Sequence, residues 1–99
     1  MNFKGKVIPT EELYKAVIGL KNIDECQAFF EDICTISEIY AMAQRLEVAQ
    51  MLDEDKAYNE ISEKTHASST TISRVSRCLN YGKGGYRIVL DKMKENNNE

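Results

Sequence analysis

The stretch from Ala57 to Leu79 constrains the fold most, because it reads as two short helices joined by a tight turn. Residues 58–64 form the first predicted helix, residues 65–67 fill the turn, and residues 69–79 form the second helix. This arrangement predicts a helix-turn-helix motif. His66 stands in the turn where many such motifs use Gly, so its backbone is expected to adopt an unusual conformation.

The second helix of this motif has two chemically different faces. At helical spacing, Ile72, Val75 and Leu79 share one face, and Ile61 of the first helix joins them on the inner side. Hydroxyl and guanidinium groups without any carboxylate occupy the rest of the helix. They belong to Ser69, Thr70, Thr71, Ser73, Arg74 and Arg77.

Four consecutive Ser and Thr residues at a helix start suggest a role other than stability, because both are mediocre helix formers. Ser68 stands at the N-cap position, where its side-chain oxygen can accept a bond from a first-turn N–H. Free N–H groups and small hydroxyls at a helix start let it approach phosphate closely. The pattern favours DNA contact by the second helix in the major groove. The alternative is an ordinary solvated helix face.

The net charge of −3 taken alone argues against a nucleic-acid partner, but the charge is unevenly distributed. Between positions 64 and 90 there is no Asp or Glu, whereas the remaining sequence holds eight basic and 16 acidic residues. A positive region on an acidic body is typical of a domain that presents one face to phosphates. The basic residues of this region are Lys64, Arg74, Arg77, Lys83 and Arg87.

The rest of the chain predicts four further helices and no strand. Thr10 is the expected N-cap of a first helix, a second runs from about Glu25 to Ile33, and a third begins with a Thr35–Glu38 capping box and continues to about Leu52. The third helix is apolar on most of its circumference, which places it in a core or a subunit interface. Acidic residues 53–55 then form a turn that is expected to be solvated.

The three glycines of NYGKGG, residues 80–85, separate the helix-turn-helix from a last amphipathic helix. We predict one all-α domain over residues 1–99. Its dimerisation core comprises residues 10–52 and 85–95, its helix-turn-helix residues 57–80, and its frayed tail residues 96–99. The apolar faces of six helices are hard to bury in the core of one small chain. A homodimer solves this, and it suits a palindromic DNA site.

Composition argues against several other classes of protein. No apolar run approaches the ~18 residues that span a bilayer, and the N-terminal residues lack an apolar signal core. Cys26, Cys34 and Cys78 form no disulfide or zinc-ligand pattern, and the first two are expected to be buried hydrophobes. We therefore expect a cytoplasmic protein with no metal, no cofactor and no membrane association.

An enzyme is not expected either. The single His lies in a turn with no carboxylate placed to orient it, and no strand precedes the glycines around Lys83 to make a phosphate loop. The stronger alternative is a helical protein-interaction module that docks onto another regulator. An exposed apolar patch would favour the protein-interaction module, whereas a basic face spanning two subunits would favour DNA binding.

The order of six helices, the long third helix holding Arg45, and the run TTISRVSRCLN resemble the Trp repressor (TrpR-like) superfamily. The ending LNYGKGGY is most similar to its YerC/YecD subfamily. The resemblance covers nearly the whole chain and is most specific over residues 58–86. It implies an all-helical, intertwined homodimer that binds operator DNA and acts as a transcriptional repressor.

The resemblance also implies site residues. Family contacts to DNA fall on Asn59 and Ser62 of the first motif helix, and on Ser69, Thr70 and Ser73 of the second. Asn59 and Ser62 are shorter and less basic than the family's usual residues. Phosphate anchoring is therefore expected to depend more on Arg77 and Lys83.

The family's corepressor pocket is only partly matched. Arg74 corresponds to the arginine that holds the ligand carboxylate, and Arg45, allowing for one missing residue, corresponds to the arginine that packs against the indole. The residue after the first arginine is Gly in the tryptophan-binding protein and Val75 here. A branched side chain would occupy the ligand's place. We therefore expect no tryptophan corepressor, which leaves Arg74 available for a phosphate, a base or another anion.

Overall fold

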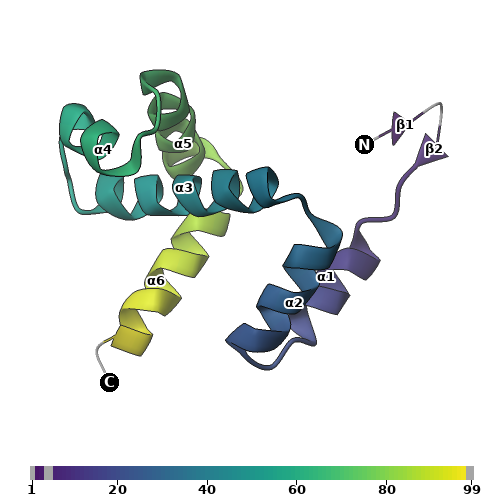
Figure 1. Ribbon diagram of the computed structural model, residues 1–99. Helices are drawn as coiled ribbons and strands as arrows, with labels where there is room; N and C mark the ends of the chain where they lie inside the picture. Colours follow the sequence, from purple (N-terminus) through teal and green to yellow (C-terminus); the bar gives the residue numbers. More distant parts are fainter. Residues whose placement is uncertain (1, 4–5, 98–99) are drawn as a thin grey trace. The chain divides into compact units, whose positions relative to one another are not determined.

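The computed structural model describes residues 2–3 and 6–97, and it is all-helical apart from one short strand pair (Figure 1). The strands β1 (Asn2–Phe3) and β2 (Lys6–Val7) are antiparallel, with Asn2 opposite Val7 and Phe3 opposite Lys6. No strand was expected from the sequence, because two residues are too few to show alternation. The six predicted helices are confirmed. They are α1 (Glu11–Ile18), α2 (Ile23–Ile33), α3 (Ile36–Asp53), α4 (Tyr58–Thr65), α5 (Ser69–Tyr81) and α6 (Gly85–Asn97).

Helices α1 and α2 belong to a first compact unit, which ends at Ile36. α1 follows Thr10 as predicted, but the Thr10 side chain accepts no capping hydrogen bond and its backbone is already helical. α2 begins at Ile23 rather than near Glu25. The reason is local: the Asn22 side chain accepts the Glu25 backbone N–H at 2.8 Å and so caps the helix two residues earlier.

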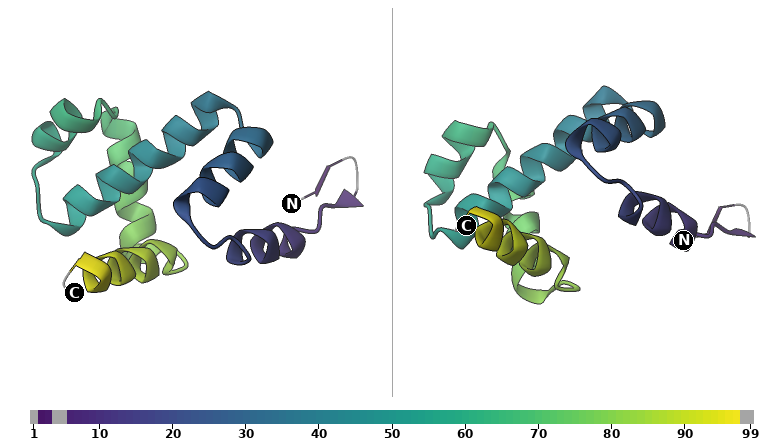
Figure 2. Two further views of the ribbon diagram at one scale, coloured as in Figure 1. Left: turned by 60° about the horizontal axis from the view of Figure 1, so that its bottom comes forward. Right: turned by 90° about the horizontal axis from the view of Figure 1, so that it is seen from below.

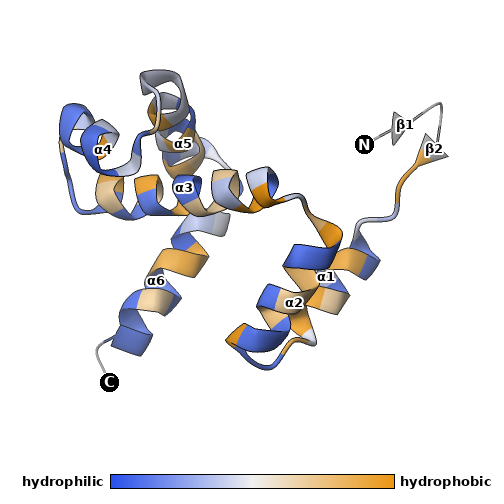
Figure 3. Cartoon of the chain, in the orientation of Figure 1, coloured by the Kyte–Doolittle hydropathy of each residue, from blue (hydrophilic) through white to orange (hydrophobic). Residues whose placement is uncertain are grey.

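The apolar residues of the first unit lack a core of their own. No side chain of α1 or α2 is buried, and hydrophobic residues lie along both helices (Figure 3). Ile18 and Ile23 are 82% and 81% exposed. Cys26 and Cys34, which were predicted to be buried, are only partly buried, and Cys78 of α5 is exposed.

The second compact unit, from Ser37 onward, contains the core. α4 and α5 lie on one side of α3, and α6 crosses it on another (Figures 1 and 2). The C-terminal half of α3 is the buried half, whereas Ile36 and Tyr40 at its N-terminal end are exposed. Every one of these four helices, and the turn between α4 and α5, contributes to one cluster. Its buried members are Val48, Ala49, Met51, Ile61, Ala67, Ile72, Val75 and Leu90.

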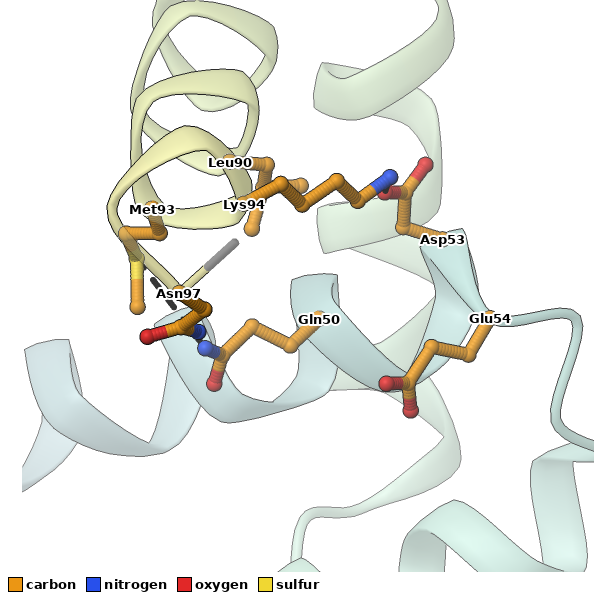
Figure 4. Close-up of a pocket in the computed structure, with 7 residues that line it drawn as sticks. All are labelled: Gln50, Asp53, Glu54, Leu90, Met93, Lys94 and Asn97. Atoms are coloured by element: carbon orange, nitrogen blue, oxygen red, sulfur yellow. Dashed lines mark hydrogen bonds and ion pairs between the residues drawn. The ribbon is translucent and has the colours of Figure 1, made fainter. Parts of the chain in front are cut away.

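Asp53 joins the end of α3 to α6 by ion pairs. Its carboxylate accepts from Arg87 Nη2 at 2.7 Å, and its side chain is 12% exposed. Its second oxygen lies 2.6 Å from Lys94 Nζ (Figure 4). The prediction that this acidic turn is merely solvated is therefore wrong for Asp53. Arg87 and Lys94 hold the pKa of Asp53 down, from its usual value of 3.8 to about 2.

Gly82 ends α5 where the backbone turns sharply. Its N–H donates to the Cys78 carbonyl at 2.9 Å, and a Cβ at this position would lie 2.4 Å from that oxygen. A side chain is therefore excluded by contact with backbone.

We predict that Gly82→Ala lowers the free energy of unfolding by about 1–3 kcal/mol, because the new methyl group overlaps the Cys78 carbonyl. Gly85→Ala is the matched control, since a Cβ there meets nothing within 4 Å. The control should be neutral or slightly stabilising, as for other Gly-to-Ala changes in a helix. Urea unfolding of the two variants measures this difference. Equal stabilities would contradict the proposed backbone contact.

Asp53 also predicts a dependence of stability on pH. Because its pKa is lower in the folded chain than in the unfolded chain, its contribution is complete above about pH 4 and is lost as the pH falls towards 2. Asp53→Asn should cost about 1–2 kcal/mol at neutral pH, a moderate value because both partners are half-exposed. The variant and the wild type should converge near pH 2.

Urea unfolding between pH 2 and pH 7 measures this convergence. Glu54→Gln is the control, because Glu54 is exposed and forms no ion pair with any residue that the structure describes. A stability difference for Asp53→Asn that stays constant over this pH range would show that the ion pairs are not its cause.

Candidate nucleic-acid interface

The α4–turn–α5 segment is a helix-turn-helix whose two helices begin and end close to the predicted positions. α4 ends one residue later than expected and α5 two residues later. His66 between them has a φ of 61° and a ψ of 17°, which is the left-handed conformation expected for a residue in place of Gly. The His66 N–H donates to the Ser62 carbonyl at 2.8 Å and closes the end of α4.

Side-chain hydrogen bonds hold this turn in place. The buried Thr65 hydroxyl donates to the Ile61 carbonyl at 2.8 Å and accepts the Ala67 N–H at 3.1 Å. Ser62 Oγ donates to the Ala67 carbonyl at 3.1 Å, and Gln44 Nε2 of α3 donates to the Thr65 carbonyl at 3.0 Å. These bonds give the Thr65 hydroxyl and carbonyl and the Ala67 N–H and carbonyl partners inside the protein, and they connect the turn to α4 and α3.

The start of α5 is capped as predicted. Ser68 Oγ accepts the Thr71 N–H at 3.1 Å and donates to Thr71 Oγ1 at 3.1 Å. These two hydroxyls thus bind each other and the helix start. Ser69 and Thr70 beside them are exposed, so they remain available to an outside partner.

One face of α5 is buried and the other is open. Ile72 and Val75 are each 1% exposed, whereas Ser73, Arg74 and Arg77 are exposed. Lys83 follows in the exposed turn before α6. Among the residues that the structure describes, no carboxylate lies within ion-pair distance of Arg74, Arg77 or Lys83. α5 therefore presents hydroxyl and guanidinium groups on an open surface, while its opposite face is packed in the core.

Three other residues of the predicted DNA-binding region, Asn59, Ser62 and Arg87, already form bonds within the protein. The Asn59 side chain accepts the Glu60 N–H at 3.0 Å on an exposed part of α4. The Ser62 hydroxyl already donates its proton within the turn, so it reaches a phosphate only by giving up that bond. Arg87 belonged to the predicted positive region, but it pairs with Asp53 and with Asp91 at 3.2 Å. These two ion pairs therefore largely neutralise the charge of Arg87 within the fold.

The predicted pocket residues Arg45, Arg74 and Val75 do lie together. They line one hollow of about 310 Å³, and Cys78 and Tyr86 complete its wall. Val75 is nevertheless a core side chain, so its methyl groups fill space between the helices. Gln44, Cys78 and Tyr86 were not predicted as site residues. Only the helical spacing of Arg74 and Cys78, four residues apart, could have indicated one of them.

Comparisons with known proteins identify relatives of this chain. The family model described as Trp repressor protein matches residues 10–94. The uncharacterized protein YerC of Bacillus subtilis (strain 168) is 51% identical over 89 residues, which are 90% of this chain and 86% of that protein. No described helix is long and apolar enough to cross a membrane.

Two crystal structures share the fold. A TrpR-like protein from Eubacterium eligens ATCC 27750 is 52% identical with a TM-score of 0.82, over 85% of this chain and 87% of that one. A proposed Trp repressor from Staphylococcus aureus is 43% identical, also with a TM-score of 0.82, over 85% of this chain and 84% of that one. The helix-turn-helix, the matched residues 10–94 and these relatives together show that the chain belongs to the Trp repressor family.

Proposed function

We propose that the protein is a sequence-specific DNA-binding transcriptional regulator that acts as a repressor. The observation that supports this proposal most directly is the open, acid-free face of α5, whose opposite face is buried in the core of the second unit. Ser69, Thr70 and Ser73 are the proposed contacts to bases and nearby phosphates, and Arg74 and Arg77 the contacts to phosphates or bases. Family membership supports the same function, since the Staphylococcus aureus relative is described as a proposed Trp repressor.

Phosphate anchoring in this proposal comes chiefly from Arg77 and Lys83. Both are exposed, and neither is paired with a carboxylate in the described structure. Asn59 and Ser62 of α4 are proposed to contribute weaker contacts to the backbone. Ser68 and Thr71 act by capping α5, which presents the free N–H groups of its first turn to a phosphate.

The proposed active form is a homodimer that binds a palindromic operator. Exposed apolar residues of α1, α2 and the start of α3 support it, because a second copy would remove them from water. The same exposed residues also favour the alternative function, docking onto a different regulator. The DNA experiment below separates the two functions.

We predict that selection from a random duplex pool enriches a palindrome without added tryptophan.

Arg77→Gln and Lys83→Gln should each weaken binding by a few-fold to about tenfold and reduce the slope of log affinity against log salt by about one. Lys92→Gln is the control, because Lys92 is an exposed cation of α6 outside the motif. Absence of enrichment at low salt, or an equal effect of Lys92→Gln, would rule out this interface.

We also propose that the protein works without a tryptophan corepressor, because Val75 lies in the wall of the hollow that holds Arg45 and Arg74. Calorimetric titration with tryptophan should give no saturable heat for the wild type. Val75→Gly should give measurable binding, since it opens the wall. Ile72→Ala loosens the core from the same helix and should not. Stoichiometric binding by the wild type would refute the proposal.

A further inference from the structure

A hydrogen bond from α3 reaches the turn of the helix-turn-helix. Gln44 Nε2 donates to the Thr65 carbonyl at 3.0 Å, although the two residues are 21 positions apart. Thr65 is the last residue of α4 and is only 7% exposed. The last carbonyls of a helix have no partner within the helix, and a buried one is costly to leave unpaired. Gln44 therefore supplies a partner that the end of α4 would otherwise lack.

The core that packs the motif against α3 is apolar. Val48 of α3 belongs to one cluster with Ile61 of α4 and Ile72 of α5. Apolar burial is non-directional, so it fixes the angle of α4 and α5 on α3 less sharply than a hydrogen bond does. The Gln44 bond adds a directional contact at the end of α4, apart from that cluster. Together the two attachments define an orientation that the apolar one alone leaves adjustable.

α3 connects this attachment to the surface that the proposed dimer covers. It is one helix of 18 residues, and Gln44 lies in its middle. Ile36 and Tyr40, at its N-terminal end, are exposed apolar residues. In a dimer formed there, the angle of α4 and α5 on α3 sets the separation and direction of the two copies of α5. A palindromic site needs both to match, because its half-sites lie at a fixed separation along the duplex.

We propose that Gln44 is a positioning residue that restricts the protein to one half-site spacing, because its bond to the Thr65 carbonyl fixes the orientation of α5 on α3. Gln44 acts through the turn and contacts no DNA. The inference rests on the proposed function, a dimer that binds a palindrome. One base pair more or less between the half-sites displaces one of them by about 3.4 Å and rotates it by about 35°. A fixed pair of α5 helices cannot follow that change, whereas a loosely attached pair can.

Selection from duplexes of different spacing tests this role. The pool carries the two halves of the selected palindrome at the selected spacing, and at spacings one or two base pairs longer or shorter. Gln44→Met keeps the length of the side chain and removes the donor. We expect it to reduce the preference for the best spacing over its neighbours by about two- to tenfold, the factor that one ordinary hydrogen bond supplies. The slope of log affinity against log salt should stay the same, since no phosphate contact is lost.

Gln50→Met is the matched control. Gln50 is a second half-buried glutamine of α3, but its Nε2 points to Met93 Sδ of α6, 4.0 Å away. Its replacement should leave the spacing preference unchanged. An unchanged preference in Gln44→Met, or an equal reduction in Gln50→Met, would overturn the role of Gln44.

Amide hydrogen exchange in the free protein measures the positioning without DNA. The His66 and Ala67 N–H groups are hydrogen-bonded within the turn, and the Val75 N–H inside α5 reports opening of the core. Gln44→Met should speed exchange at His66 and Ala67 by about two- to tenfold relative to Val75, and Gln50→Met should not. An equal acceleration at all three amides would mean that Gln44 only stabilises the fold, and no acceleration would mean that the bond does not hold the turn. Either result contradicts a positioning role.

The two measurements separate failure of this inference from failure of the proposed function. If the wild type selects no DNA sequence, the proposed function fails and the spacing role fails with it, while the exchange rates still decide whether Gln44 holds the turn. If the wild type selects a palindrome and Gln44→Met changes the turn amides without changing the spacing preference, the inference is overturned and the proposed function stands.

Discussion

Burial of Ile61, Ile72 and Val75 against the second half of α3 is the contact on which the second unit depends. α4 has eight residues and α5 has 13, and the outward faces of both are almost entirely polar. Neither helix brings enough apolar surface to persist alone, since most helical stability in proteins comes from packing. Val48 and Ala49 of α3 are fully buried beneath them. The hydrophobic effect thus holds the motif to one support.

That support explains why the outer face of α5 can be so unlike an ordinary helix surface. Ser69, Thr70 and Ser73 contribute little to helix stability, and a helix made mainly of such residues would be weak. The cap by Ser68 and the buried Thr65 network offset this weakness at the helix start. The residues on the outer face of α5 are therefore not the residues that keep the helix folded. They can be selected for binding to a partner without loss of helix stability.

Local patterns predicted much of this fold, and long-range pairings could not be predicted. Ile72, Val75 and Ser68 follow periodicity and capping rules that act within a few residues, and the structure bears these predictions out. Asp53 and Arg87 are 34 positions apart, and Gln44 and Thr65 are 21 apart, so no local rule joins them. Of the residues that line the hollow, only Arg45, Arg74 and Val75 were predicted, and that prediction came from the family resemblance. Cys78 and Tyr86 required the spatial arrangement of α5 and α6.

Val75 is at once a core residue and a wall of the hollow. A change that enlarges the hollow removes methyl groups from a side chain that is 1% exposed, and such a loss costs a few kcal/mol out of a typical total of about 5–15. Acquiring a bulky ligand by this route is therefore not a neutral step for the chain. Stabilising changes elsewhere in the second unit would have to come first. The evolution of ligand binding in such a protein is thus limited by its free energy of unfolding as well as by the chemistry of the site.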